Sequence, residues 1–239
     1  MKDIGTRMKE NYENRYRFYL TRRTPVIIRL DGKAFHTLTK DCEKPFDLDF
    51  NTSMVYTAAQ LVADIQGAKI AYVQSDEISI LLTDYDNLDT EAWFDYNLQK
   101  IVSVSAAMAT SKFTECYLFP GDTREALFDA RAFNIPRDEV SNYFIWRQQD
   151  WIKNSVQMLA RAHFSHKALL GKNQQAMITM LEKIGVRWNE LPELLKNGTF
   201  LIKALSGMLT ETFKLTEKGR DFIDAIVRTD LEVYLSRSQ

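Results

Sequence analysis

Cysteine is scarce in this chain, and its scarcity argues against several classes of protein at once. Only two of the 239 residues are cysteines, Cys42 and Cys116, and they lie far apart and outside any C-x-x-C pair. This pattern supports neither a disulfide framework nor a cysteine-based zinc or redox site, so we expect two unpaired thiols. His163 and His166 are too few to make a zinc site without nearby cysteines.

Long apolar runs are missing as well. No stretch approaches the roughly 20 apolar residues that a membrane-spanning helix needs. Residues 1–20 carry Asp3, Glu10 and Glu13 among their basic residues and lack the apolar core of a signal peptide. We therefore expect a cytosolic protein that does not associate with membranes.

A strong excess of positive charge is also absent. The formal net charge of -1 argues against a highly cationic nucleic-acid coat protein, so any polynucleotide partner must be held by a local patch. With 45% hydrophobic and 26% charged residues, the composition is that of an ordinary globular protein with one substantial core or two modest ones.

The order of the predicted elements between residues 25 and 135 indicates the fold. Apolar runs and helical spacing predict strand, helix, strand, strand, helix and strand, in that order, at residues 26–30, 49–66, 68–74, 78–83, 91–113 and 128–135. This is the βαββαβ pattern of the ferredoxin-like fold, an α/β (α+β) class that serves as the palm of many nucleotide polymerases and cyclases.

Two regions are expected to pack as one compact unit. Residues 1–135 would form the palm-like catalytic region, which includes an N-terminal helix over 7–20. Residues 136–239 read as a mostly helical region packed on the palm, with helices at 138–162, 173–184 and 222–235.

Acidic residues stand at two predicted strand ends. The run 26–30 ends in Asp31 and Gly32, and Asp76 and Glu77 lie at the tip of the predicted hairpin. Each motif alone is also what an ordinary turn looks like. In a ferredoxin-like sheet, however, the first and third strands are neighbours, which brings Asp31 close to Asp76 and Glu77. Carboxylates that converge at low dielectric repel unless a cation lies between them, and Mg²⁺ is the hard cation used with nucleotide phosphates.

Five motifs in order then resemble the tRNA-His guanylyltransferase family. They are IRLDGKAFH at 28–36, KP at 44–45, AYVQSDE at 71–77, FDAR at 128–131 and WRQQD at 146–150. The resemblance spans roughly residues 20 to 205, and although each motif alone is weak, the ordered set is specific. It implies an enzyme that extends RNA in the 3′-to-5′ direction, with tRNA, ATP and GTP or other nucleoside triphosphates as substrates, two Mg²⁺ ions and a tetrameric assembly.

The resemblance also implies roles for individual residues. Asp31, Asp76 and the Gly32 carbonyl would be metal ligands, and Glu77 would support the catalytic acids from behind. The nucleotide would be bound by Gly32, Lys33, Ala34, Phe35, His36, Lys44, Ser75 and Lys100.

One departure from the family pattern bears on the substrate. Eukaryotic members follow W-R-Q-A-D with C-H-I-N-N-L-Y-N, whereas residues 151–156 here read WIKNSV, which loses the histidine and keeps Asn154. This favours the bacterial and archaeal guanylyltransferase-like branch, which repairs truncated tRNA 5′ ends by templated addition, over dedicated addition of the -1 guanosine. Arg147, Lys153 and Asn154 are the candidate tRNA-binding residues, although cations scattered on a helix also suit a solvated face.

Two other functions use the same scaffold. A nucleotide cyclase or 5′-to-3′ polymerase palm would also place acids at these strand ends, and product analysis separates it from reverse polymerisation. A non-catalytic RNA-binding module would expose aromatic residues on its central strands, where this chain has Ile28, Leu30, Ile78 and Ile80. The four tryptophans, Trp93, Trp146, Trp151 and Trp188, are expected first as core or interface residues.

Overall fold

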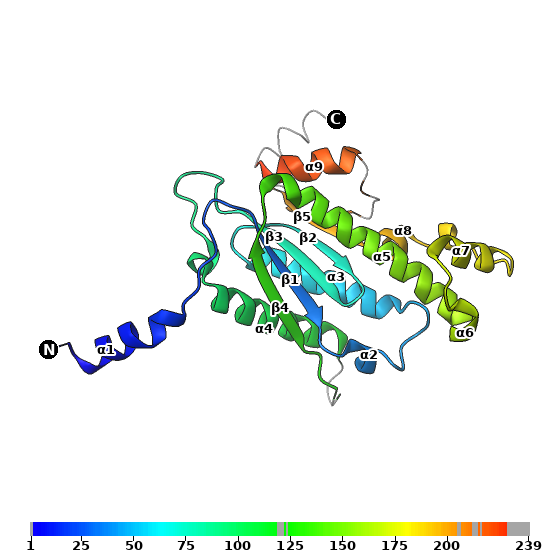
Figure 1. Ribbon diagram of the computed structural model, residues 1–239, viewed down its shortest axis with the longest axis horizontal. Coiled ribbons are helices and arrows are strands. Elements are labelled where there is room, and N and C mark those ends of the chain that lie inside the picture. The colour runs from blue at the N-terminus through cyan, green and yellow to red at the C-terminus, as the bar shows by residue number, and fades with distance from the viewer. Residues whose placement is uncertain are drawn as a thin grey trace.

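A six-stranded antiparallel sheet organises the chain in the computed structural model (Figure 1). The structure describes residues 2–118, 122, 124–204, 207–211, 215 and 217–228. The strand order is β4-β1-β3-β2-β5-β6. The strands are β1 (Val26–Gly32), β2 (Ala68–Gln74), β3 (Glu77–Leu82), β4 (Phe128–Asn134), β5 (Thr199–Ala204) and β6 (Gly207–Glu211).

The predicted ferredoxin-like order is confirmed by the elements from β1 to β4. Helix α3 (Leu48–Asp64) connects β1 to β2, and helix α4 (Leu98–Tyr117) connects β3 to β4. The other helices are α1 (Ile4–Asn11), α2 (Phe35–Leu38), α5 (Val140–His163), α6 (His166–Leu169), α7 (Gln174–Glu182), α8 (Glu193–Asn197) and α9 (Glu217–Val227). Short 3-10 helices are η1 (Glu13–Tyr16), η2 (Trp93–Tyr96), η3 (Arg137–Glu139) and η4 (Trp188–Glu190).

Both connecting helices begin at side chains that cap them. Asp47 accepts a hydrogen bond from the Phe50 N–H at 2.8 Å at the start of α3, and Asn97 accepts one from the Lys100 N–H at 3.1 Å at the start of α4. Gly67 follows α3 with φ of +80°, and an added Cβ there would lie 2.6 Å from the Thr83 carbonyl oxygen. The turn that leads α3 into β2 therefore requires glycine.

The two faces of the sheet have different chemistry. Helices α3 and α4 cover one face with a mostly apolar layer, in which Ile28, Leu30 and Ile80 are fully buried. On the other face, Ile27 and Leu81 pack under α5 and α9, but only toward one end of the strands. The opposite end of that second face is polar, and there the end of β1 lies between the start of β3 and the start of β4.

Two expectations about the N-terminal half are corrected. The predicted helix over 7–20 is instead α1 followed by η1, which extend away from the sheet and bury no residue (Figure 1). The predicted helix over 91–113 begins seven residues later, at Leu98, because Phe94 and Asp95 have positive φ angles of 51° and 50°. Residues 91–97 therefore form a turn that positions the start of α4.

The C-terminal region contributes two strands besides its helices, and sequence reasoning did not predict these strands. Strand β5 pairs with β2 and β6 pairs with β5, so residues from both predicted regions share one sheet. The predicted helix over 222–235 corresponds to α9, which starts five residues earlier, at Glu217. Residues 229–235 of that prediction lie outside the described residues, as does most of the turn predicted at 120–122. Both cysteines are unpaired, as expected. Among the residues the structure describes, no helix is long and apolar enough to cross a bilayer.

Candidate active site

The end of β1 and the tip of the β2–β3 hairpin meet at the polar end of the sheet. Asp31 lies opposite Glu77 in the strand register, and the Gly32 N–H donates to the Asp76 carbonyl oxygen at 3.0 Å. Ser75, which precedes Asp76 in the hairpin, has a positive φ of 48°. The structure therefore confirms that the two strand ends converge, while the role of Asp31 and Asp76 as metal ligands stays a prediction.

The acids at this corner interact unfavourably with one another. Burial raises the pKa of Asp31, the negative charges of Asp76 and Glu77 raise it further, and the Arg29 guanidinium opposes them. Burial also raises the pKa of Asp76, against hydrogen bonds from its own backbone and from Ser75 that lower it. At neutral pH the ionised pair is therefore under electrostatic strain that a bound cation would relieve.

The donor set fits Mg²⁺ held together with a nucleotide. Among the described residues, no three His, Cys, Asp or Glu side chains gather to make a complete metal cage. Mg²⁺ seldom uses such a cage, because it keeps several waters and is held by one or two carboxylates together with substrate phosphates. Asp31 and Asp76 would supply those two carboxylates, and the Gly32 carbonyl stays a predicted third ligand.

Glu77 is fully engaged by arginines. Arg147 on α5 donates to both carboxylate oxygens of Glu77, through Nε and Nη2, at 2.7 Å each. The Arg29 Nη2 lies 2.6 Å from Oε2 of the same carboxylate, and Gln74 donates to Oε1 at 3.1 Å. Arg147 also pairs with Asp150 at 3.1 Å. The Glu77 carboxylate is therefore committed to these partners, and its position behind Asp31 suits support of the catalytic acids.

Arg147 does not fit its predicted role as a tRNA ligand. Only 4% of its surface is exposed, and its guanidinium is held by Glu77 and Asp150. A group that is buried and paired in this way is not available to phosphates. Arg147 instead ties α5 to the sheet, and the structure corrects the prediction.

Gly32 is required because the Phe35 ring lies against it. An added Cβ at Gly32 would come within 2.4 Å of the ring, and Phe35 is only 2% exposed. The Phe35 ring contacts those of Phe50, Phe113 and Phe128 at centroid distances of 6.1, 5.4 and 4.9 Å. The Phe35 side chain therefore anchors the loop after β1 in the core, and its predicted contact with the nucleotide stays a prediction.

We expect Gly32→Ala to destabilise the protein by roughly 1–3 kcal/mol, the usual penalty for overpacking a filled core. Thermal unfolding measures the change. Phe35→Leu in the Gly32→Ala background is the matched control, because a smaller side chain makes room for the new methyl group. If the double variant is no more stable than Gly32→Ala, the clash with Phe35 is not the cause.

A cavity opens on one side of the hairpin tip. Among its lining residues are five that were predicted to bind nucleotide or metal: Phe35, His36, Lys44, Ser75 and Asp76. Lys44 is exposed, and its Nζ donates to the Thr39 carbonyl oxygen at 2.7 Å. Lys33 and Ala34 are exposed in the loop between β1 and α2, where Ala34 has a positive φ of 54°. A triphosphate in this cavity would reach Asp76, whereas Asp31 is not among the residues that line it.

Lys100 does not belong to this cavity within the chain. It lies in the first turn of α4, with its Nζ 5.6 Å from the centre of the Phe94 ring. The later part of α4 reaches the site, since the Thr110 hydroxyl accepts a hydrogen bond from the Phe128 N–H and Phe128 pairs with Gly32. Ten residues of helix, about 15 Å, separate Lys100 from that contact. Within one chain, Lys100 therefore lies away from the cavity, and its predicted contact with the nucleotide stays a prediction.

A second cavity lies between the hairpin tip and α5. Asp31, Asp76 and Asn154 line it, together with Arg29 and Arg161. Lys153 is exposed on α5 but is not among its lining residues. Asn154 is therefore placed beside the acids as predicted, while contact of Asn154 or Lys153 with tRNA stays a prediction. Sequence reasoning missed Arg29, although its spacing of two residues from Asp31 in a strand places both side chains on one face.

Comparisons with known proteins agree on one family. The model of the tRNAHis guanylyltransferase family matches residues 5–136. A bacterial tRNA(His) guanylyltransferase-like protein in complex with ATP superposes with a TM-score of 0.88 at 48% identity, over 94% of this chain and 99% of that one. One in complex with GTP gives a TM-score of 0.81 at 44% identity, with the same coverage. The tRNA(His) guanylyltransferase of Debaryomyces hansenii is 31% identical over 202 residues, 75% of this chain and 74% of the relative.

Proposed function

Since the chain belongs to the tRNAHis guanylyltransferase family, we propose that it is a nucleotidyltransferase that adds nucleotides to the 5′ end of tRNA in the 3′-to-5′ direction. The observation that carries the proposal is the convergence of Asp31 and Asp76 beside a cavity that contains Lys44 and Ser75. The ATP and GTP complexes of the similar bacterial proteins support nucleoside triphosphates as substrates. We further propose that the enzyme assembles as a homo-oligomer, by the family resemblance.

The reaction would begin with activation of the RNA end. An oxygen of the tRNA 5′-monophosphate attacks the α-phosphorus of ATP, and pyrophosphate leaves. The 3′-hydroxyl of the incoming nucleotide then attacks the activated 5′-phosphate, and AMP leaves. The lengthened RNA carries the triphosphate of the added nucleotide, so a further addition can proceed directly with loss of pyrophosphate.

The residues of the chain divide this work between binding and charge control. Asp31 and Asp76 would hold two Mg²⁺ ions, which lower the pKa of the attacking hydroxyl and stabilise charge on the leaving phosphate. Lys44 would neutralise charge on the triphosphate, and Ser75 would line its site. Arg29 and Arg147 neutralise the Glu77 carboxylate, so that its charge does not add fully to that of the acid pair. No serine, cysteine or histidine nucleophile is required.

Repair of truncated tRNA by templated addition is favoured over dedicated addition of one guanosine. The support is the sequence after the WRQQD motif, where the family histidine is replaced. A 5′-truncated, 5′-monophosphorylated tRNA, incubated with ATP, the four nucleotides and Mg²⁺, should grow at its 5′ end until the acceptor stem is paired. Growth at the 3′ end would indicate an ordinary polymerase. Addition of a single guanosine whatever the template would favour dedicated guanylylation. The absence of any lengthened RNA would contradict the enzymatic proposal.

Lys44→Ala should raise the KM for ATP about tenfold while leaving tRNA affinity unchanged, because a hydrogen bond to a charged group contributes about 1.5–3 kcal/mol. Steady-state kinetics at saturating tRNA measure the change. Lys183→Ala is the matched control and should leave this KM unaltered, since Lys183 is exposed at the end of α7 and does not line the cavity. Equal effects of Lys44→Ala and Lys183→Ala on this KM would remove Lys44 from the nucleotide site.

A further inference from the structure

Trp146 is the tryptophan that the fold leaves open to solvent. It is 52% exposed on α5, whereas Trp93 and Trp151 are 8% and 2% exposed. Trp188 is partly buried, and its ring N–H donates to the Ser155 hydroxyl at 2.9 Å. The other three tryptophans are therefore packed against the protein, as expected. The exposure of Trp146 is not explained by packing.

The exposed indole is nevertheless held in place. The Tyr143 ring meets it edge-on, with centroids 5.8 Å apart, and the Arg147 guanidinium lies over the indole at 4.5 Å. Both partners are themselves fixed, because the hydroxyls of Tyr143 and Ser79 lie 2.8 Å apart and Arg147 is clamped to Glu77. Trp146 thus presents a rigid aromatic surface to solvent, which loses little conformational freedom when a ligand stacks on it.

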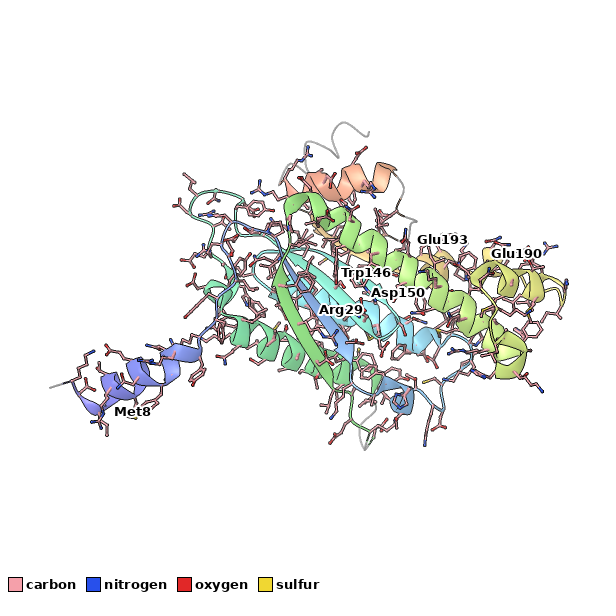
Figure 2. The ribbon with its side chains drawn as sticks, in the orientation of Figure 1. Met8, Arg29, Trp146, Asp150, Glu190 and Glu193 are labelled. Carbon is pink, nitrogen blue, oxygen red and sulfur yellow. The ribbon has the colours of Figure 1, made fainter. Side chains whose placement is uncertain are left out.

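The position of Trp146 relates it to the acids. Its two neighbours on α5 reach β3 at Ser79 and Glu77, the residues that face Arg29 and Asp31 in the sheet register. Trp146 therefore lies over the part of β1 that leads to the catalytic corner. Figure 2 shows the labelled Trp146, Asp150 and Arg29 where α5 passes over the sheet.

We propose that Trp146 is a stacking platform for a base at the 5′ end of the bound RNA. The inference rests on the proposed function, which requires the 5′-phosphate of an RNA to reach Asp31 and Asp76. The cavity with Lys44 and Ser75 can take a mononucleotide, whereas Trp146 faces open solvent, where a polymer has room. On β4, Arg131 lies opposite Arg29 in the register, and its side chain is 57% exposed. Its Nη2 lies 3.6 Å from Asp129 and 4.0 Å from Asp31, so the RNA backbone would share this positive charge with the two acids. Stacking on an aromatic side chain accepts any base, as repair of different tRNA ends requires.

Trp146→Leu and Trp146→Phe separate stacking from packing. The probe is a 5′-truncated, 5′-monophosphorylated tRNA transcript carrying a fluorophore at its 3′ end, titrated without ATP. We expect Trp146→Leu to weaken binding roughly 5- to 100-fold, as loss of one stacked base does, and Trp146→Phe to weaken it much less. The KM for ATP should be unchanged in both. Tyr56→Leu is the matched control, since Tyr56 is 42% exposed on α3, which covers the other face of the sheet.

Tryptophan fluorescence gives a second readout that does not depend on how Trp146→Leu folds. Binding of the unlabelled transcript should quench the emission of the wild-type protein, and Trp146→Phe should remove that quenching. Equal tRNA affinity in Trp146→Leu and wild type, or undiminished quenching in Trp146→Phe, would overturn the inference. A wild-type protein that binds no tRNA would instead contradict the proposed function.

Discussion

Asp31→Asn should abolish nucleotide addition, with a loss of roughly 10³-fold or more, while the protein melts at the same temperature or higher. Metal-assisted charge stabilisation supplies several kcal/mol, and each 1.4 kcal/mol is a tenfold change in rate. The single-turnover rate of addition to a 5′-truncated tRNA measures the loss, and calorimetry measures the melting temperature.

The melting temperature of Asp31→Asn should stay the same or rise although activity is lost, because the folded state raises the pKa of Asp31. A carboxyl with a raised pKa binds its proton more tightly in the folded chain than in the unfolded one. Its favourable contribution exists below the ordinary pKa and is lost as pH rises through the raised value. At neutral pH the charge of Asp31 therefore destabilises the fold, and asparagine does not carry it.

Asp129→Asn is the matched control for this prediction. Asp129 faces Asp31 across the β1–β4 pair and is exposed, and its charge also raises the pKa of Asp31. Its replacement removes a negative charge from the same corner and leaves the two predicted ligands in place. We expect an effect of no more than a few-fold on the rate. An Asp31→Asn variant that keeps a tenth of wild-type activity would exclude the proposed metal role.

Arg147→Met should produce the largest loss of stability, about 3 kcal/mol in the free energy of unfolding. The side chains of Arg147 and Glu77 are only 5% and 7% exposed, and removal of one member of a buried pair leaves the other charge inadequately compensated. Arg29 still contacts Glu77, which places the expected value at the lower end of the range for such pairs. Urea unfolding measures the change.

Two further variants test the cause. Arg187→Met removes one member of an exposed pair with Glu190, whose side chains are 67% and 66% exposed, and should not measurably change stability. Glu77→Gln combined with Arg147→Met removes both charges of the pair and should lose less stability than the sum of the losses in the two single variants. If the loss of unfolding free energy in the double variant equals the sum of the two single losses, the two residues do not act as a pair.

The sequence predicted the part of this architecture that depends on local pattern. Alternating and continuous apolar runs identified the strands that carry Asp31 and Asp76, and the order of elements placed those strands side by side. The fold then brings the Gly32 N–H to the Asp76 carbonyl oxygen. Convergence of the two acids was thus predictable, because a ferredoxin-like order fixes which strands are neighbours.

The errors have a common physical origin in contacts between distant residues. Arg147 lies 70 residues from Glu77 in the chain, so neither charge alone reveals that they neutralise each other. Lys100 was assigned by resemblance, and its contact with the nucleotide stays a prediction, since the turn around Phe94 and Asp95 sets where α4 begins and so where Lys100 lies. Strands β5 and β6 are short and follow a helical region, and only their pairing with β2 gives them a place in the sheet.

Counting bound divalent ions shows whether Asp31 and Asp76 hold the metal. Titration of Mn²⁺ into the protein with a non-hydrolysable ATP analogue, followed by electron paramagnetic resonance, counts the ions that the chain holds. We expect two ions per chain in the wild-type protein and in Asp129→Asn, and loss of tight binding when Asp31 and Asp76 are both replaced by asparagine. Undiminished binding of two ions by that double variant would contradict it.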